Sequence, residues 1–587
     1  MRLLSKAVQA SRAWRNFAVL AALAATACTP GSQIPNDAAA PAACIVDGTT
    51  FAGWFKNGNI ETDGEVLPAD SLHFQTLNGP VCDFYAWSEQ MFLWLNSPTP
   101  ASYGGGGGRI FNSPAFFAVS TPDISSGHIV RTLIANLPGS NHLAFLRDSQ
   151  VGANGFPILR DKSGKFFELA PTPLGPSGRQ MIQDRSGKLV EVDRATLGPG
   201  GVAVFFDKSG QAIALPTSAA PSAQRSAVGA IAAVVVHKFT FGHNTIIVDP
   251  IGNTVDIEQG QAGGDVLMAQ NLSPVYYTIA VNDIYAYFET GLQATGPFAI
   301  PNSPNKTFPT DQAGLDEITN FATHHDSSLT FPDTRALTVE VKAAWVEAVN
   351  LPPGCSYITM QASIPTYTPG STQWTNNGQR TATLALVGMH VVGSVANHNE
   401  MIWATFEHVC NAPNAGYSYD SQFNGTKTGP VGTGPWLFSA SDAPIPFNQP
   451  HMHYTDTAVP PTIDAYPSFT ISPSDTKRMM PWGFPGSSSA NNSGVLAINY
   501  AVRSQLPTDD ARVNYIMTGA TWTKGGVGAP VFGAPSLENT TMETYQQSTD
   551  GTTDPGGNCF SCHNGAPLGD SSGNGLSHIF GVLKPLF

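Results

Sequence analysis

The sequence has few charged side chains and, after position 27, no long apolar run. Charged residues make up 12% of the 587, and 43 Asp and Glu outnumber 29 Lys and Arg. Nucleic-acid binding needs a basic surface, so this acidic balance argues against it. No later apolar run approaches the roughly 18 residues of a membrane-spanning helix. The patterns G-x-S-x-G and H-E-x-x-H are also absent, so neither a serine hydrolase nor a zinc protease is indicated.

The composition favours a loop-rich exported protein with much β-structure. The chain contains 58 Gly and 46 Pro, and 10% of its residues are aromatic. Its length allows more than one domain and a large core. We therefore expect an α+β, β-rich fold and neither a disordered chain nor a helical bundle.

The segment 1–27 has the features of an export signal. Four basic side chains precede an apolar run at 17–27, which is too short to span a bilayer. The small residues at 25–27 stand directly before Cys28, an arrangement that resembles a bacterial lipoprotein signal. The resemblance implies a lipidated Cys28 and, because Thr29 replaces the Asp of inner-membrane retention, an outer-membrane destination facing the periplasm or cell surface. Ordinary signal cleavage is the alternative.

The most specific pattern is Cys-Phe-Ser-Cys-His at 559–563. C-x-x-C-H is the attachment signal for one covalent haem c. Cys559 and Cys562 each bond a vinyl group, and His563 becomes the proximal iron ligand. The alternatives are a redox pair, half of a zinc site or a disulfide. No second C-x-x-C exists to complete a zinc site, and the adjacent His favours haem.

Only the short segment 564–587 follows His563, less chain than a small cytochrome c domain usually needs. We therefore expect a haem segment that docks on a large host. His578, beyond a Gly-rich stretch, is the first candidate for the sixth iron ligand, and Met542 is the second. A strong sixth ligand gives an electron carrier, whereas an open position permits peroxide or O₂ chemistry.

Seven cysteines support an oxidising compartment. If Cys28 carries lipid and two others carry haem, four remain, and an even remainder suggests two disulfides. Three pairings exist for Cys44, Cys82, Cys355 and Cys410. Proximity in sequence favours Cys44–Cys82 and Cys355–Cys410, and free buried thiols are the alternative.

A repeated Asp-x-x-Gly pattern occurs between 151 and 260. Asp161, Asp184 and Asp207 recur at a constant spacing, and Asp249 begins a degenerate fourth copy. Asp bonds its own turn and Gly takes a positive φ, so each copy predicts a β-hairpin turn, and together they predict a β-meander subdomain. One carboxylate per copy is too few for a Ca²⁺ cage.

The expected organisation along the chain is a signal peptide at 1–27, a tether at 28–43, the N-terminal part of the main body at 44–150, the hairpin-repeat subdomain at 151–260, the main β-rich body at 261–550 and the haem attachment segment at 551–587. Apolar periodicity predicts helices at 83–95 and 311–326, with a short helix candidate at 540–547. It also predicts strands at 275–281, 383–392 and 401–409, with the last two paired through a loop at 393–400.

Several histidines are further candidates. Alternation along 401–408 places Glu407 and His408 on opposite faces, and His408 shares the apolar face, which favours a core histidine. His390 lies on the expected partner strand. Other histidines occur in pairs at 324–325 and at 451 and 453. The second pair lies on one side of an extended segment and could bind a metal or a haem, but a loop with incidental histidines is the favoured interpretation for both pairs.

Four stretches together are similar to a group of functionally uncharacterised bacterial exported proteins with one C-terminal c-type haem motif. They are 261–268, 275–277, 403–409 and the C-x-x-C-H motif. The resemblance implies a haem protein without an established activity, and it assigns roles only to Cys559, Cys562 and His563.

The leading expectation is an exported monohaem protein that transfers electrons. Loss of the signal changes the formal charge from −14 to −18, because the segment 1–27 holds four basic side chains and no acidic one. This charge is compatible with a basic redox partner. The alternatives are a haem enzyme of peroxidase or oxygenase type, and a structural or binding lipoprotein whose C-x-x-C is only redox-active.

Overall fold

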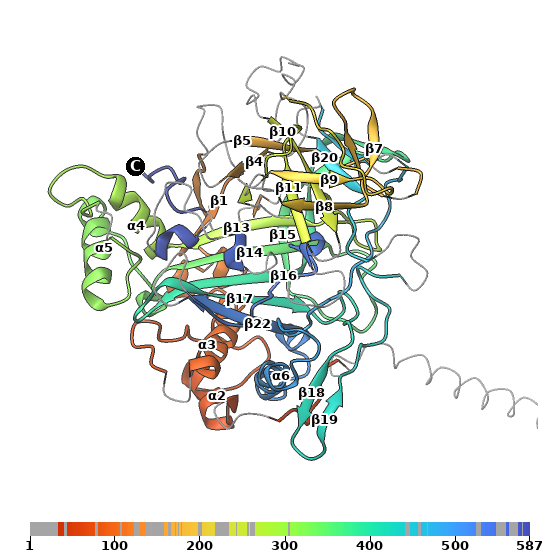
Figure 1. Ribbon diagram of the computed structural model, residues 1–587. Coiled ribbons are helices and arrows are strands. Elements are labelled where there is room, and N and C mark those ends of the chain that lie inside the picture. Colours follow the sequence, from red (N-terminus) through yellow and green to blue (C-terminus); the bar gives the residue numbers. More distant parts are fainter. Residues whose placement is uncertain are drawn as a thin grey trace, which may run out of the picture.

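The computed structural model describes residues 33–39, 44–76, 80–105, 108–121, 130–136, 142–143, 158–161, 166–170, 172–173, 175–177, 179–197, 202–217, 234–241, 244–254, 257–258, 265–302, 306–440, 447–455, 460–466, 468–523, 530–547, 559–562, 573–577 and 579–587. Within these residues the fold is mixed and β-rich, and a large sheet occupies its centre (Figure 1).

The central sheet joins 12 strands among the described residues, and its main path runs β2-β1-β13-β14-β16-β17-β22-β23 with every neighbouring pair antiparallel. The strands of this path are β1 (Phe116–Val119), β2 (Leu133–Ala135), β13 (Tyr276–Asn282), β14 (Val339–Glu347), β16 (Gln373–Val395), β17 (His398–His408), β22 (Tyr515–Thr523) and β23 (Val531–Gly533). Four more join it off this path: β3 (His142–Leu143), β15 (Thr359–Thr368), β20 (Met452–Thr455) and β21 (Thr462–Ala465).

Helices α2 (Gly48–Trp54), α3 (Pro80–Leu95) and α6 (Ser489–Arg503) lie on one side of the sheet, below it in Figure 1. We call this side the helical face. Phe406 of β17 stacks on Phe92 of α3 with ring centroids 4.3 Å apart. These helices therefore bury the apolar half of each alternating strand.

The opposite side of the sheet, which we call the C-terminal face, is covered by different parts of the chain. Helices α4 (Asp283–Gln293) and α5 (Gln312–His325) cover one end together with residues 579–587. The carboxamide oxygen of Asn282 and the carboxylate of Asp311 accept hydrogen bonds from the first turns of these two helices, 3.1 and 2.8 Å long. Such caps satisfy N–H groups that lack a partner within the helix.

The segment 158–258 forms smaller sheets above the C-terminal face (Figure 1). Its strands are β4 (Ile158–Asp161), β5 (Phe166–Ala170), β6 (Met181–Gln183), β7 (Leu189–Glu191), β8 (Arg194–Leu197), β9 (Ala203–Phe206), β10 (Val234–Phe241), β11 (Asn244–Val248) and β12 (Ile257–Glu258). β5 and β10 pair in parallel, so the expected all-antiparallel meander was wrong in this respect.

Three Asp-x-x-Gly turns within this segment share one geometry. The Asp184 carboxylate accepts bonds from the N–H groups two and four residues later, at 2.8 and 3.0 Å. Asp207 and Asp249 repeat this pattern. The glycine of each turn has a positive φ of 81–92°, as the sequence pattern predicts. The turn after Asp161 lies outside the described residues.

Most of the strongly periodic elements were predicted correctly. The helix expected at 83–95 is α3, the one at 311–326 is α5, and the strand at 275–281 is β13. The loop expected at 393–400 was wrong, because β16 runs to Val395 and β17 begins at His398. The short helix candidate at 540–547 contains only the 3-10 turn η9 (Thr544–Gln546).

Part of the segment expected to be a tether is bound to the body. Residues 33–39 lie along the hairpin of β18 (Ser418–Ser421) and β19 (Gly425–Thr428), and Ala38 forms a β-bridge with Ser421. A tether composition therefore did not exclude docking, since backbone groups supply the bonds.

Both favoured disulfides are present. Cys44 is bonded to Cys82, and Cys355 to Cys410, with Cα atoms 4.8 and 6.6 Å apart. The first links the start of the body to α3, and the second links the loop before β15 to the end of β17.

In the part of the chain that the structure describes, no helix combines the length and apolarity needed to cross a bilayer.

Candidate functional site

The cysteines of the C-x-x-C-H motif begin and end a single helical turn, α7 (Cys559–Cys562). Cys559 is half-buried, while Phe560 between them is buried and packs edge-on against Trp403 of β17, with ring centroids 6.0 Å apart. Phe560 thus docks α7 on the C-terminal face of the sheet. His563 and His578 lie outside the described residues.

The residues after the motif are also attached to this face. The 3-10 turn η10 (Gly573–Leu576) is followed by Ser577, whose hydroxyl donates to Glu340 of β14 at 2.7 Å and lies 2.9 Å from the Tyr285 hydroxyl of α4. The amide of Gly581 donates to Glu289 at 2.6 Å. The chain on both sides of residue 578 is therefore held by buried polar groups.

Burial changes the ionisation of these groups. It raises the pKa of Glu289 to about 8, only partly offset by the bond from Gly581. Burial also raises the pKa of the Tyr285 hydroxyl well above its usual value. At pH 7 both side chains are therefore mostly neutral, and they place little negative charge beside the C-terminal segment.

Strand register defines two neighbouring rows on the C-terminal face. Trp403 pairs with Val392, which pairs with Glu340, so α7 and Ser577 contact the same row. The next row contains His390 and Lys342, because they occupy the following same-face positions. Residues two positions apart along a strand are separated by about 7 Å. The second row therefore lies directly beside the docked C-terminal segment.

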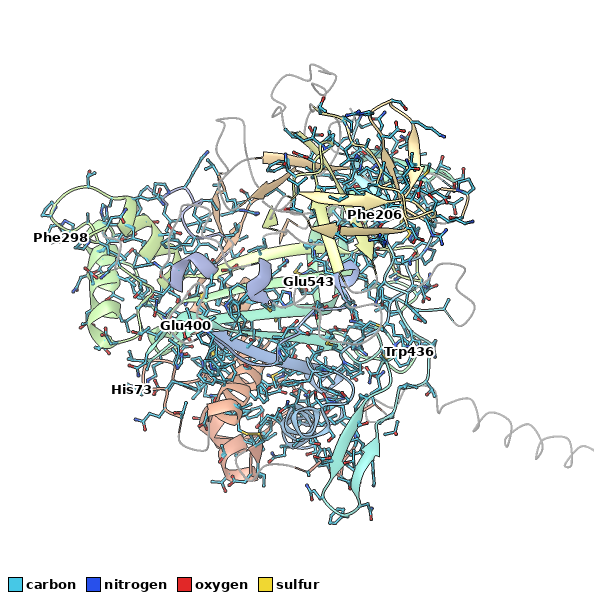
Figure 2. All side chains as sticks on the ribbon, in the orientation of Figure 1. His73, Phe206, Phe298, Glu400, Trp436 and Glu543 are labelled. Atoms are coloured by element: carbon cyan, nitrogen blue, oxygen red, sulfur yellow. A yellow bond between two sulfur atoms is a disulfide. The ribbon has the colours of Figure 1, made fainter. Side chains whose placement is uncertain are left out.

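Lys342 and His390 hold a carboxylate between them. Glu543, labelled above the central strands in Figure 2, places both oxygens 3.1 Å from His390 Nε2 and one oxygen 3.7 Å from Lys342 Nζ. The side chains of Lys342, His390 and Glu543 are 13%, 16% and 22% exposed, so solvent still reaches this ionic cluster. Burial opposes ionisation of Glu543, but His390 and Lys342 overcome it and lower its pKa to about 2.

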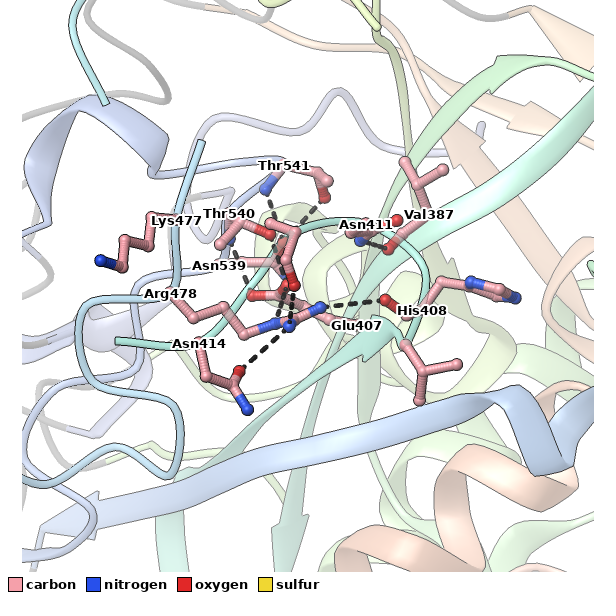
Figure 3. Close-up of polar contacts among 12 residues, drawn as sticks. Val387, Glu407, His408, Asn411, Asn414, Lys477, Arg478, Asn539, Thr540 and Thr541 are labelled. Atoms are coloured by element: carbon pink, nitrogen blue, oxygen red, sulfur yellow. Dashed lines mark hydrogen bonds and ion pairs between the residues drawn. The ribbon is translucent and has the colours of Figure 1, made fainter. Parts of the chain in front are cut away.

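A second, deeper network fixes the loop that carries Glu543 (Figure 3). Glu407 accepts a bond from Arg478 Nε at 2.7 Å and another from the amide of Thr540 at 2.8 Å. The other nitrogens of Arg478 donate to the carbonyls of His408 and Ala412 at 3.0 and 2.6 Å. Both charges are buried and satisfied, so this pair positions the loop at 539–547 and offers no reactive group.

The expected core role of His408 is confirmed. Its ring stacks on Tyr357 at 3.8 Å, and its Nε2 lies 3.0 Å from the carbonyl of Ser356. Burial lowers the pKa of His408 to about 3, so this histidine is neutral in the folded protein. Glu407 and His408 point to opposite sides of β17, as alternation predicts.

The other candidate side chains are dispersed. Met542 is buried in an apolar cluster with Leu437 and Phe438. His451 lies 2.9 Å from the carbonyl of Ser472. His324 and His325 are the last two residues of α5, and their rings pack against the exposed side chains of Phe298 and Phe587. Among the described residues no three His, Cys, Asp or Glu side chains converge as a metal site.

The described residues fit a covalently held haem c. Two cysteines one helical turn apart could form the thioether bonds of such a haem, and Trp403, Phe560, Leu576 and Ile579 belong to one buried apolar cluster. An apolar wall next to a cysteine pair and an adjacent histidine is the setting that such a haem requires.

Sequence reasoning identified the C-x-x-C-H motif but gave no functional role to Glu543, Lys342 or Trp403. Glu340 and Lys342 are charged residues at same-face positions near the start of a mostly apolar strand, which could have indicated a functional face. Glu543 had no such signal, because its partner His390 lies 153 residues earlier in the chain.

Comparison of the chain with protein-family models, with curated proteins and with solved structures found no match.

Proposed function

We propose that the protein is an exported c-type cytochrome with one covalent haem, and that it transfers electrons. The observation that carries the proposal is the Cys-x-x-Cys-His motif. Its two cysteines stand at the two ends of the α7 turn, and Phe560 packs this turn against Trp403. A haem in this position supplies reversible one-electron transfer.

Each residue has a distinct part in the proposal. Cys559 and Cys562 form the thioether bonds, His563 binds the iron, and His578 is the first candidate for the sixth ligand. The apolar cluster around Trp403 limits water access. The host sheet thus supplies an apolar wall beside the haem segment.

The first test is a pyridine haemochrome spectrum of the protein produced with a haem c maturation system. One covalent haem per chain is expected, and Cys559→Ala/Cys562→Ala should abolish it. A protein without covalent haem would refute the proposal and favour a redox-active C-x-x-C.

The second test concerns the sixth ligand. We expect a low-spin ferric spectrum for the wild type and a high-spin spectrum for His578→Ala. An unchanged low-spin spectrum would remove His578 from the iron, and a parallel Met542→Ala variant would show whether the second candidate replaces it.

A haem enzyme of peroxidase or oxygenase type is the second candidate function. The observation in its favour is the solvent-accessible His390–Glu543 pair beside the C-terminal segment, because a carboxylate-oriented histidine is suited to proton transfer. A high-spin ferric wild type that binds cyanide readily would favour it. His390→Ala should then slow peroxide turnover while haem content stays constant.

We also infer that Cys28 is acylated and anchors the protein to the outer membrane, facing the periplasm or cell surface. The lipoprotein-like residues at 25–28 support this anchor. Mass spectrometry of the mature N-terminus tests it, and an unmodified chain beginning after residue 27 would indicate ordinary secretion.

The hairpin repeats are proposed to form a subdomain at 151–260. Their small apolar clusters, around Phe205 and around Val236, are separate from those of the central sheet. Limited proteolysis that leaves the main body folded after cleavage within 218–233 would support this division, and loss of the whole fold would refute it.

A further inference from the structure

The N-terminal end of the described chain is clamped to one surface of the body. Gln33 is buried, its amide donates to the carbonyl of Val409 at 2.8 Å, and its oxygen accepts a bond from Arg478 at 3.2 Å. Asp37 accepts bonds from Tyr419 at 2.8 Å and from Lys427 at 2.5 Å. Residues 33–37 therefore have a defined position on the body.

Because residues 33–37 are fixed on the body, an arrangement we call the N-terminal clamp, only a few residues connect the body to the proposed acyl anchor at Cys28. Gln33 comes five positions after Cys28, and five extended steps of the chain span about 17 Å. The headgroup layer on each side of a bilayer takes about 6 Å of this length. The surface around Gln33 must then lie within roughly 10 Å of the headgroups.

Exposed apolar side chains lie on both sides of the clamp. Phe423, at the turn between β18 and β19, is 77% exposed, and the backbone amide of its neighbour Gln422 donates to the carbonyl of Asp37. Val431 is 48% exposed and follows the same hairpin. The partly exposed Trp436, labelled at the edge of Figure 2, lies close to Gly432.

Gly432 connects the second group to the clamp. It has a φ of 86°, and a Cβ built there would stand 2.7 Å from the Trp436 ring and 3.0 Å from the Gln33 amide. Trp436 and Gln33 therefore lie against the same backbone position. Partly exposed aromatic side chains such as Trp436 suit the membrane interface, because one end of the side chain is apolar and the other end can stay hydrated.

We propose that this surface, formed by Phe423, Val431 and Trp436 around the clamped residues 33–39, rests on the lipid headgroups. The proposal rests on the acylation of Cys28. Its occupant is the bilayer that holds the anchor, because the short connection from Cys28 to Gln33 keeps this surface within roughly 10 Å of the headgroups.

The arrangement also orients the haem segment. The hairpin β18–β19 lies beside α6, which covers the helical face (Figure 1). By contrast, α7 packs on the C-terminal face through Trp403. The β18–β19 part of the membrane surface and the haem segment therefore lie on opposite faces of the central sheet, while Gln33 lies at the end of β17. The haem is turned toward the aqueous compartment, where a soluble redox partner reaches it.

The test uses the acylated full-length protein in phosphatidylethanolamine–phosphatidylglycerol vesicles, with single spin labels at Phe423→Cys and Val431→Cys. Phe298→Cys is the matched control, because Phe298 is 49% exposed and lies on the opposite side of the molecule in Figure 2 from Trp436. Oxygen, which partitions into the bilayer, should relax the labels at 423 and 431. A water-soluble nickel chelate should relax these two labels several-fold less than it relaxes the label at 298.

The outcomes separate this inference from the anchor itself. Vesicle-bound protein with all three labels equally open to the nickel chelate would overturn the docking surface and leave the anchor intact. Protein that does not float with vesicles and carries an unmodified Cys28 would overturn both. Protection of 423 and 431 in vesicle-free Cys28→Ser protein would assign the surface to a second copy of the chain and overturn the lipid contact.

Discussion

Replacing Glu543 by Gln removes the anion that holds Lys342 and His390 together on the C-terminal face. His390 and Lys342 lower the pKa of Glu543 to about 2 despite its burial, from an ordinary value of 4.5. This lowering of the pKa corresponds to about 3 kcal/mol of stability at neutral pH. The side chains of Glu543, His390 and Lys342 are 22%, 16% and 13% exposed, so solvent screens only part of this contribution.

The pH dependence of this effect has a definite sign. A carboxyl with a depressed pKa stabilises the fold above its unfolded pKa of 4.5, and the contribution is lost as the pH falls toward about 2. The difference between wild type and Glu543→Gln in urea unfolding should therefore stay near about 3 kcal/mol at pH 7 and 5 and fall to about 2 kcal/mol at pH 3.5.

Glu65→Gln is the matched control, because Glu65 pairs with Lys56 at the surface, where the side chains are 27% and 50% exposed. It should cost at most about 1 kcal/mol. A Glu543→Gln effect as small as that of the control, or one that does not change between pH 5 and 3.5, would refute the proposed coupling.

Three further predictions follow from the fold. Phe560→Ala should lower the haem content per chain in a pyridine haemochrome assay, because α7 loses its buried contact with Trp403. A haem content equal to that of wild type would show that haem attachment does not depend on this contact. Removing the Cys355–Cys410 disulfide by a double Ala substitution should reduce the unfolding free energy by about 4 kcal/mol, as expected for a sequence separation of 55, and a loss below about 1 kcal/mol in urea titrations would contradict the estimate. Asp207→Ala should lower the protection of the turn amides against hydrogen exchange, relative to the intrinsic rate at the same pH, because the Asp207 carboxylate accepts the Ser209 N–H. The Asp207 pKa is lowered chiefly by the Ser209 hydroxyl, so wild type should lose this protection only as the pH falls below the ordinary Asp value of 3.8. Protection unaffected by the substitution would contradict the role of the carboxylate.

Local patterns predicted local structure well. The aromatic periodicity of 83–95 became α3, and the Asp-x-x-Gly repeats became hairpin turns at Asp184 and Asp207. In both cases the determining interactions lie within a few residues along the chain, so that sequence spacing alone specifies them.

Long-range arrangements were predicted less well. The parallel pairing of β5 with β10 and the docking of 33–39 on β18–β19 depend on segments far apart in sequence. The closure of such contacts depends on the packing of the whole chain, and no local pattern encodes it. The same reason explains why Glu543 was not recognised as the partner of His390.

The chemistry available to this protein can be read without its fold, because the motif at 559–563 and the number of cysteines are covalent properties of the chain. The surroundings of that chemistry depend on folding, which places α7 against Trp403 and the Lys342–His390–Glu543 cluster one row away. Folding also sets the clamped residues 33–39 against the end of β17 and the β18–β19 hairpin. Burial and strand register create these neighbours, and both exist only once the sheet has formed.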